Sequence, residues 1–201
     1  MSDPIAAEAV AAAAAPSAAS ASSIKIRAPK ERGAPSSPSS ATFVPPRDSI
    51  TGTWHVTHST LPMWKKARNV AITYAPLSED ASPKLDDTVT YQNLTSPALK
   101  TVSGIDTPAG DGAWSWRGKG WLMIASSHWQ FLGYGGGGEG EGWAVTYFQK
   151  TLFTPAGIDI YSRRKEGLGA EVLEGITAAL GENESEEIRG LAKVLFEVKR
   201  D

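Results

Sequence analysis

Short runs with a two-residue period of hydrophobic and polar positions fill the chain from about residue 50 to residue 164. In residues 70–74 the large side chains Val, Ile and Tyr occupy every second position, as in a β-strand with one buried face. Segments rich in Gly, Pro, Asp and Ser separate the runs, and their composition is typical of turns. We therefore expect eight strands, in residues 52–59, 69–77, 86–93, 99–106, 113–120, 127–134, 142–153 and 157–164.

The order of these runs predicts the fold class. Parallel strands need long crossover connections, and the turns between the runs are too short to contain them, so a parallel α/β sheet is excluded. An up-and-down antiparallel barrel or a sandwich fits, and eight strands is the size at which a barrel interior can hold one small ligand. We predict an all-β, eight-stranded antiparallel barrel.

A helical period follows the last strand. Val172, Ile176 and Leu180 are spaced four apart, and a second apolar stripe runs through residues 188–198. We expect one or two amphipathic helices that pack on the barrel or over its mouth, with Asn183 as the N-cap of the second.

The first 46 residues have a different composition. They consist largely of Ala, Ser and Pro, which offer too little apolar surface to offset the entropy of ordering. We predict a disordered tail in residues 1–46 and a folded domain in residues 47–201. The early acids Asp3 and Glu8 do not fit a secretory signal, so a cytoplasmic location is expected, with import into an organelle left open.

Composition narrows the chemistry. Lys plus Arg is 20 and Asp plus Glu is 22, a formal net charge of −2, which gives no general reason to expect nucleic acid or an anionic membrane as a partner. No run is long enough to span a membrane. The absence of cysteine excludes thiol catalysis and iron–sulfur clusters. His55 and His58 are three apart on a predicted strand and face opposite sides, so they are not expected to share a metal ion. Neither a metal nor a cofactor is expected.

Two short motifs carry a family resemblance. Gly52-Thr53-Trp54 opens the first predicted strand, and Arg163 ends the last. The chain thereby resembles the lipocalin or calycin superfamily, although the T-D-Y motif of that family has no match, since residues 140–146 read GEGWAVT. The resemblance implies that Gly52, Trp54 and Arg163 form the barrel floor, with Arg163 stacked on Trp54. It also implies a cup for a small, mostly apolar or aromatic molecule.

Strand alternation and the aromatic residues suggest which side chains contact that molecule. If Trp54 points inward, then His58 does too, and the bulkier face of each later strand is expected to line the cup. The loop after the first strand is a candidate lid that brings an aromatic and a cationic residue to the ligand. The expected ligand-binding residues are His58, Trp64, Arg68, Tyr74, Tyr91, Trp116, Trp129, Gln130, Trp143 and Tyr147.

Several functions remain open at this point. The first is an intracellular binding protein for a small hydrophobic or aromatic molecule. The alternative is a cofactor-free isomerase or cyclase on the same barrel, which a buried carboxylate paired with a histidine or tyrosine inside the cup would favour. Asp86, Asp87, Asp106 and Asp159 are the acids in or near the strands. A haem barrel resembling nitrobindin lacks a histidine after His128, and a pure interaction module would have a barrel filled by its own side chains.

Overall fold

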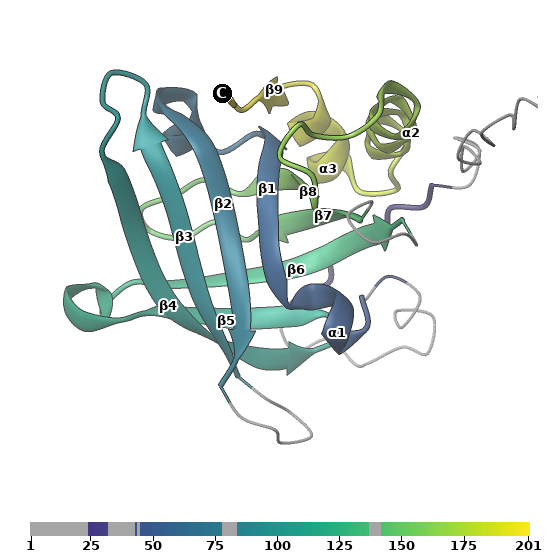
Figure 1. Cartoon of the computed structure of the whole chain (residues 1–201). Helices are drawn as coiled ribbons and strands as arrows, with labels where there is room; N and C mark the ends of the chain where they lie inside the picture. The colour runs from purple at the N-terminus through teal and green to yellow at the C-terminus, as the bar shows by residue number, and fades with distance from the viewer. Residues whose placement is uncertain (1–23, 32–42, 44, 78–83, 137–141) are drawn as a thin grey trace, which may run out of the picture.

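A computed structural model describes residues 24–31, 43, 45–77, 84–136 and 142–201 of the chain. Its strands form a closed antiparallel barrel in which each strand pairs with the next and β8 pairs with β1 (Figure 1). The prediction of an eight-stranded up-and-down barrel is confirmed. The strands are β1 (Gly52–Ser59), β2 (Ala67–Pro76), β3 (Leu85–Asn93), β4 (Leu99–Gly110), β5 (Ala113–Gly118), β6 (Ser126–Gly135), β7 (Trp143–Phe148) and β8 (Gly157–Ser162), with a short β9 (Phe196–Glu197) added beside β1.

The two ends of the barrel differ. The short helix α1 (Arg47–Ile50) precedes β1 at one end, which we call the closed end. Because the strands run up and down, the alternate connections meet at the opposite, open end. These are residues 60–66, 94–98, 119–125 and 149–156, and they include the 3-10 turns η3 (Pro62–Lys66) and η4 (Gly120–Leu122). The open end is therefore built from four separate hairpin tips.

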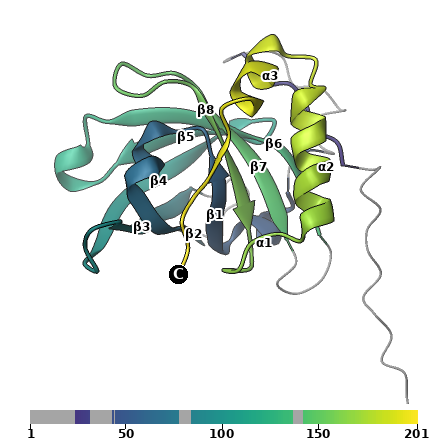
Figure 2. The same ribbon diagram turned by 90° about the horizontal axis from the view of Figure 1, so that it is seen from above.

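The predicted helices are present and lie against the side of the barrel. Helix α2 (Ala170–Gly181) and helix α3 (Glu186–Ala192) pack on the outer face of β6 to β8, where Ile176 and Ile188 are fully buried (Figure 2). They do not cover the mouth. The N-cap of α3 is Ser185, whose Oγ accepts from the Ile188 N–H, so the expectation that Asn183 caps this helix is wrong by two residues. The described helices are too short or too polar to cross a lipid bilayer.

Part of the N-terminal region packs against the barrel. The Arg27 N–H donates to the Leu132 carbonyl over 2.9 Å, and the Arg27 Nε donates to the Phe131 carbonyl over 2.9 Å. Ile26 joins the apolar cluster under α2, and its carbonyl accepts from the Asn183 side chain. For residues 24–31 the predicted disorder is therefore wrong, because backbone and side-chain hydrogen bonds to β6 order the segment. Residues 1–23, 32–42 and 44 of the predicted tail lie outside the described residues.

Candidate functional site

The closed end is sealed by the pair that the family motif predicts. Trp54 is 3% exposed, and its Nε1 donates to the Ile50 carbonyl over 2.9 Å. The Arg163 guanidinium carbon lies 3.6 Å from the centroid of the Trp54 ring, within cation–π range. The same guanidinium donates to the carbonyls of Thr53, Ser49 and Thr51 over 2.8, 2.6 and 2.7 Å. Burial lowers the pKa of Arg163 to about 10. The expected contact at the barrel floor is present.

A cavity of about 230 Å³ occupies the barrel between this floor and the open end. It reaches the surface beside Met63 and Phe153, which are 46% and 84% exposed. Its volume is that of roughly eight water molecules in the liquid, which is below the roughly 300–1,000 Å³ of drug-sized sites and suits a molecule of one or two rings. The aromatic residues that line it are Trp64, Tyr74, Trp116, Trp129, Phe148, Phe153 and Tyr161.

Two carboxyl groups meet in the wall of this cavity. Asp87 lines the cavity, and Asp106 lies behind it with no exposed surface. Burial and then the neighbouring Asp106 raise the pKa of Asp87 well above its usual range, and burial raises the pKa of Asp106 to about 7 although the Trp129 Nε1 donates to its Oδ1 over 2.8 Å. The two carboxyl groups are close enough to share a hydrogen bond, and the Trp116 side chain also donates to Asp87. A hydrogen bond between two carboxyl groups requires a proton on one of them, so their proximity and burial favour retention of a proton by the pair.

A third carboxyl group faces the same cavity from β8. Asp159 is 1% exposed, and it accepts from the Ser59 Oγ over 2.5 Å and from the Trp64 Nε1 over 3.4 Å. Burial raises its pKa to about 7, and these two hydrogen bonds act in the opposite direction. The cavity thus combines aromatic walls with two carboxyl groups, Asp87 and Asp159, whose pKa values are raised by burial. Among the described residues no group of three His, Asp or Glu side chains is placed to hold a metal ion.

One wall position has no side chain, and the aromatic lining depends on it. The indole of Trp116 lies directly on Gly104, where an added Cβ would come within 2.1 Å of the indole Nε1. The two residues belong to the paired strands β4 and β5. Glycine is required here because the indole and the backbone approach so closely.

Four of the predicted ligand-binding residues line the cavity: Trp64, Tyr74, Trp116 and Trp129. Their contact with a ligand stays a prediction. Tyr74 stacks on Trp129 with ring centroids 5.6 Å apart, so the two form one aromatic wall. Trp64 contributes from η3, at the place that the sequence suggests for a lid.

His58 does not line the cavity, and its predicted orientation is wrong. A bulge between Val56 and His58 shifts the register of β1 against β8, so Ser59 rather than His58 reaches the interior. The backbone of His58 instead pairs with that of Glu197 in β9, and the His58 ring Nδ1 lies 3.2 Å from the Thr57 hydroxyl. Burial lowers the pKa of His58.

Three aromatic or polar residues of β6 and β7 face outward, contrary to prediction. The Gln130 side chain exchanges two hydrogen bonds of 3.0 Å with the backbone of Lys30, and the Tyr147 hydroxyl donates to Glu187 of α3 over 2.8 Å. Trp143 packs in the cluster under the helices. The outer face of these strands is as apolar as the inner one because the helices and residues 24–31 cover it. In β6 and β7 the size of a side chain therefore does not distinguish the inner face of the barrel from the outer face.

Two further predicted residues lie near the cavity without lining it. Tyr91 packs edge-on against Trp64 with ring centroids 5.6 Å apart, and so supports the lining from behind. Arg68 forms an ion pair with Asp201 and is tied to the C-terminal segment through a bridge with Lys199. The predicted contact of Arg68 with an anionic ligand group is not supported, because its partner is the chain itself.

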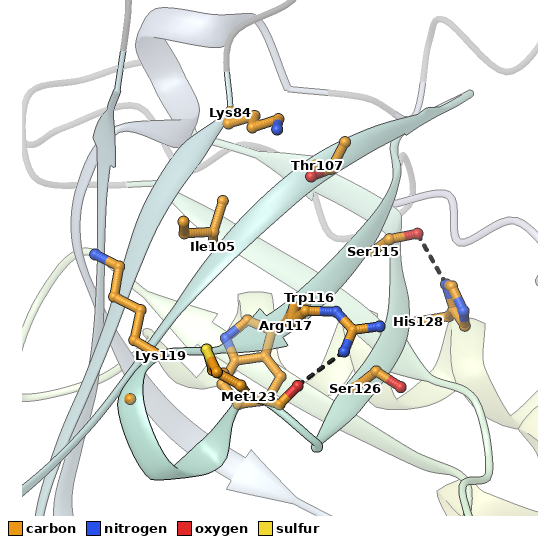
Figure 3. Close-up of a pocket in the computed structure, with 12 residues that line it drawn as sticks. Lys84, Ile105, Thr107, Ser115, Trp116, Arg117, Lys119, Met123, Ser126 and His128 are labelled. Carbon is orange, nitrogen blue, oxygen red and sulfur yellow. Dashed lines mark hydrogen bonds between the residues drawn. The ribbon is translucent and has the colours of Figure 1, made fainter.

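The outer face of β4 to β6 carries a second hollow, of about 580 Å³, beside η4 (Figure 3). Arg117 projects there and donates to the Met123 carbonyl over 2.8 Å, and the Ser115 hydroxyl lies 3.0 Å from the His128 Nδ1 (Figure 3). Arg117 is thus an exposed surface residue. This hollow lies on the opposite side of the wall from the carboxyl pair.

Comparison with known proteins agrees with this geometry. No protein-family model matches the chain. Botcinic acid biosynthesis cluster B protein 12 of Botryotinia fuckeliana (strain B05.10) is 31% identical over 144 residues, which are 67% of this chain and 66% of that protein. The chain thus spans slightly less than two thirds of that relative.

Solved structures show the fold. Apocrustacyanin C1 superposes with a TM-score of 0.57 at 16% identity, covering 81% of this chain and 83% of that one, and apocrustacyanin C2 gives 0.57 at 17% over the same shares. The siderocalin Ex-FABP gives 0.52 at 12% identity, over 76% of this chain and 94% of that one. Together with the Trp54–Arg163 floor, these matches show that the chain has a remote lipocalin-like fold.

Proposed function

We propose that the protein binds a small apolar or aromatic molecule of one or two rings in the barrel cavity. The observation that carries this proposal is a cavity of about 230 Å³ with stacked aromatic walls, in place of a barrel filled by its own side chains. Burial of ligand surface against Trp116 and Trp129 supplies affinity, and the carboxyl of Asp87 orients a polar atom of the ligand. The binding function attributed to lipocalin-like barrels supports the same reading.

Filling the cavity tests this proposal. The probe is 1-aminonaphthalene, a two-ring amine that accepts excitation energy from tryptophan. We expect saturable quenching of tryptophan fluorescence in the unaltered protein. Ser127→Trp places an indole in the cavity and is expected to weaken binding at least roughly tenfold, a change of about 1.4 kcal/mol.

The matched control is Thr101→Trp, because Thr101 is exposed on β4 and does not line the cavity. It is expected to keep the affinity of the unaltered protein. Melting temperatures of both variants show whether each has folded. Non-saturable quenching, or equal affinity in folded Ser127→Trp, contradicts the proposal.

A second candidate function, acid–base isomerisation or cyclisation of the bound molecule, is favoured by the Asp87–Asp106 pair. Asp87, the member of the pair that lines the cavity, removes a proton from the carbon next to a ligand carbonyl, and Asp106 behind it raises the proton affinity of Asp87 without touching the ligand. The proton then returns to a different carbon, so the reaction needs no oxidant and no cofactor. The raised pKa of Asp87 favours the return of the proton as well as its uptake. The relative named for a biosynthesis cluster is compatible with such a role.

Proton exchange on a simple ketone tests this second function. The protein is incubated with 2-tetralone in heavy water, and loss of the α-proton signal is followed by nuclear magnetic resonance. We expect exchange faster than in buffer, and a reduction of at least roughly tenfold in Asp87→Asn. Asp86→Asn is the matched control, since Asp86 is the neighbouring carboxylate, outside the cavity and paired with Lys119. Equal rates in the two variants would exclude the pair as the acid and base.

A further inference from the structure

We propose that the open end of the barrel docks on an anionic lipid bilayer, so that the apolar ligand passes between the membrane and the cavity. The passage of ligand rests on the proposed binding function, whereas the docking itself rests on the surface of the four hairpin tips. Three features of these tips carry the inference: exposed apolar side chains, turns that hold them outward, and an excess of lysine.

The exposed large apolar side chains of the described residues gather at one end. Ten such side chains are at least 43% exposed, and eight of them lie in or directly beside the open-end connections. Leu152 is 96% exposed, Ile124 89%, Trp121 87% and Phe153 84%. Exposed apolar groups scattered singly are ordinary, but a concentration at one end of a molecule marks an interaction surface.

Hydrogen bonds hold these side chains outward. The Thr151 hydroxyl accepts from the N–H groups of Phe153 and Thr154 over 3.1 and 3.0 Å, which fixes the turn that carries Leu152 at its tip. In the β5–β6 connection the Leu122 N–H donates to the Lys119 carbonyl over 3.1 Å, which closes the turn with Trp121, and the Ala125 N–H donates to the Leu122 carbonyl over 2.8 Å, which closes the turn with Ile124. The turns thus keep the apolar side chains exposed, where they can contact an apolar surface.

The charge of these tips is also one-sided. The four connections contain Lys65, Lys66, Lys119 and Lys150 and no Asp or Glu, although the whole chain has a net charge of −2, and Lys119 is paired with Asp86 of β3. Lys65, Lys66 and Lys150 are exposed. Lysine groups near a membrane surface are attracted to anionic headgroups, while their carbon chains remain in apolar surroundings. Although the net charge of the chain is close to zero, the connections at the open end therefore carry an excess of positive charge.

This combination fits a lipid surface better than a protein surface. Lysine is depleted in protein interfaces relative to the rest of the surface, whereas Trp and Lys together are typical of the membrane interface. Three of the four tips, in residues 60–66, 119–125 and 149–156, also contribute side chains to the lining of the cavity, whose mouth lies beside Met63 and Phe153. Insertion of the tips would place that mouth within the apolar layer, where an apolar ligand is dissolved.

Co-sedimentation with vesicles tests the docking. The full chain is mixed with sucrose-loaded vesicles of phosphatidylcholine alone or of equimolar phosphatidylcholine and phosphatidylserine. We expect binding to the mixed vesicles and at least roughly tenfold weaker binding to phosphatidylcholine alone. The double variant Trp121→Ser with Ile124→Ser is expected to weaken binding at least roughly tenfold, and neither residue lines the cavity. Leu77→Ser, at an exposed position beside the β2–β3 connection of the closed end, is the matched control and is expected to bind unchanged.

The outcomes separate docking from ligand binding. Vesicle binding that is absent, or equal in the tip variant and the Leu77→Ser control, overturns the docking proposal. So does a dimer in lipid-free solution that the tip variant abolishes, because the tips would then be covered by a second copy. Quenching by 1-aminonaphthalene is measured on the same samples without vesicles. Vesicle binding without binding of 1-aminonaphthalene refutes ligand binding in the cavity but not the docking. Binding of 1-aminonaphthalene without vesicle binding refutes the docking but not ligand binding.

Discussion

Trp54→Ala is expected to lower the free energy of unfolding by about 3–5 kcal/mol, as truncation of a large buried aromatic does. The indole is 3% exposed, packs near Tyr161 with ring centroids 6.2 Å apart, and carries the guanidinium of Arg163 on its face. Its removal opens the floor of the barrel and leaves the Ile50 carbonyl without its donor. Urea unfolding followed by circular dichroism measures the change.

The same exchange at an exposed indole is the control. Trp121 is 87% exposed, so Trp121→Ala is expected to change the free energy of unfolding by less than about 0.5 kcal/mol. Arg163→Ala is expected to cost less than Trp54→Ala, since the guanidinium is only partly buried and water can replace it at the carbonyls of Thr53 and Thr51. A loss at Trp54 no larger than that at Trp121 would show that the floor contributes nothing to stability.

The free energy of unfolding is expected to fall as the pH rises from about 4 to about 7, with Asp159 as a main cause. Burial raises the pKa of this carboxyl from 3.8 to about 7. Between these values the folded protein keeps a proton that the unfolded chain has released, so stability is present at low pH and is lost as the pH rises through the folded pKa. A shift of about three units corresponds to a loss on the order of 4 kcal/mol. Asp106 contributes in the same direction.

Replacement of the titrating group isolates its share. Asp159→Asn cannot ionise and is expected to flatten the pH dependence, measured as unfolding free energies in urea at about pH 4 and about pH 7. The Ser59 hydroxyl can still donate to the amide oxygen, so the fold is expected to persist. Asp86→Asn, at a partly exposed position, is expected to retain the slope. An unchanged slope in Asp159→Asn would show that the buried carboxyl does not titrate in this range.

The sequence predicts the barrel well because strand period and turn chemistry are local properties. The floor was predictable too, since Gly52, Trp54 and Arg163 stand at the start of the first strand and the end of the last. The predicted inward orientation of the β1 side chains is correct up to Val56 and wrong at His58. The bulge between them depends on pairing with β8, which the local sequence pattern does not show.

The chemistry of the site depends on register, which the sequence does not contain. Leu85 pairs with Asp106 and Asp87 pairs with Gly104, so the two carboxyl groups are diagonal neighbours on the inner face. Strand alternation alone could have shown that one of Asp86 and Asp87 faces inward. It could not have shown that this side chain lies beside Asp106 of the next strand, because that depends on the register between β3 and β4. The signal that was present in β8 is an acid between two isoleucines, at Asp159.

The glycine beneath Trp116 has a consequence for how such cups diversify. A methyl group at position 104 would overlap the Trp116 indole, which lines the cavity. The indole would have to move, so the shape of the cavity would change although no residue that lines it had been exchanged. The size of molecule that fits can therefore depend on a position that does not itself line the cavity.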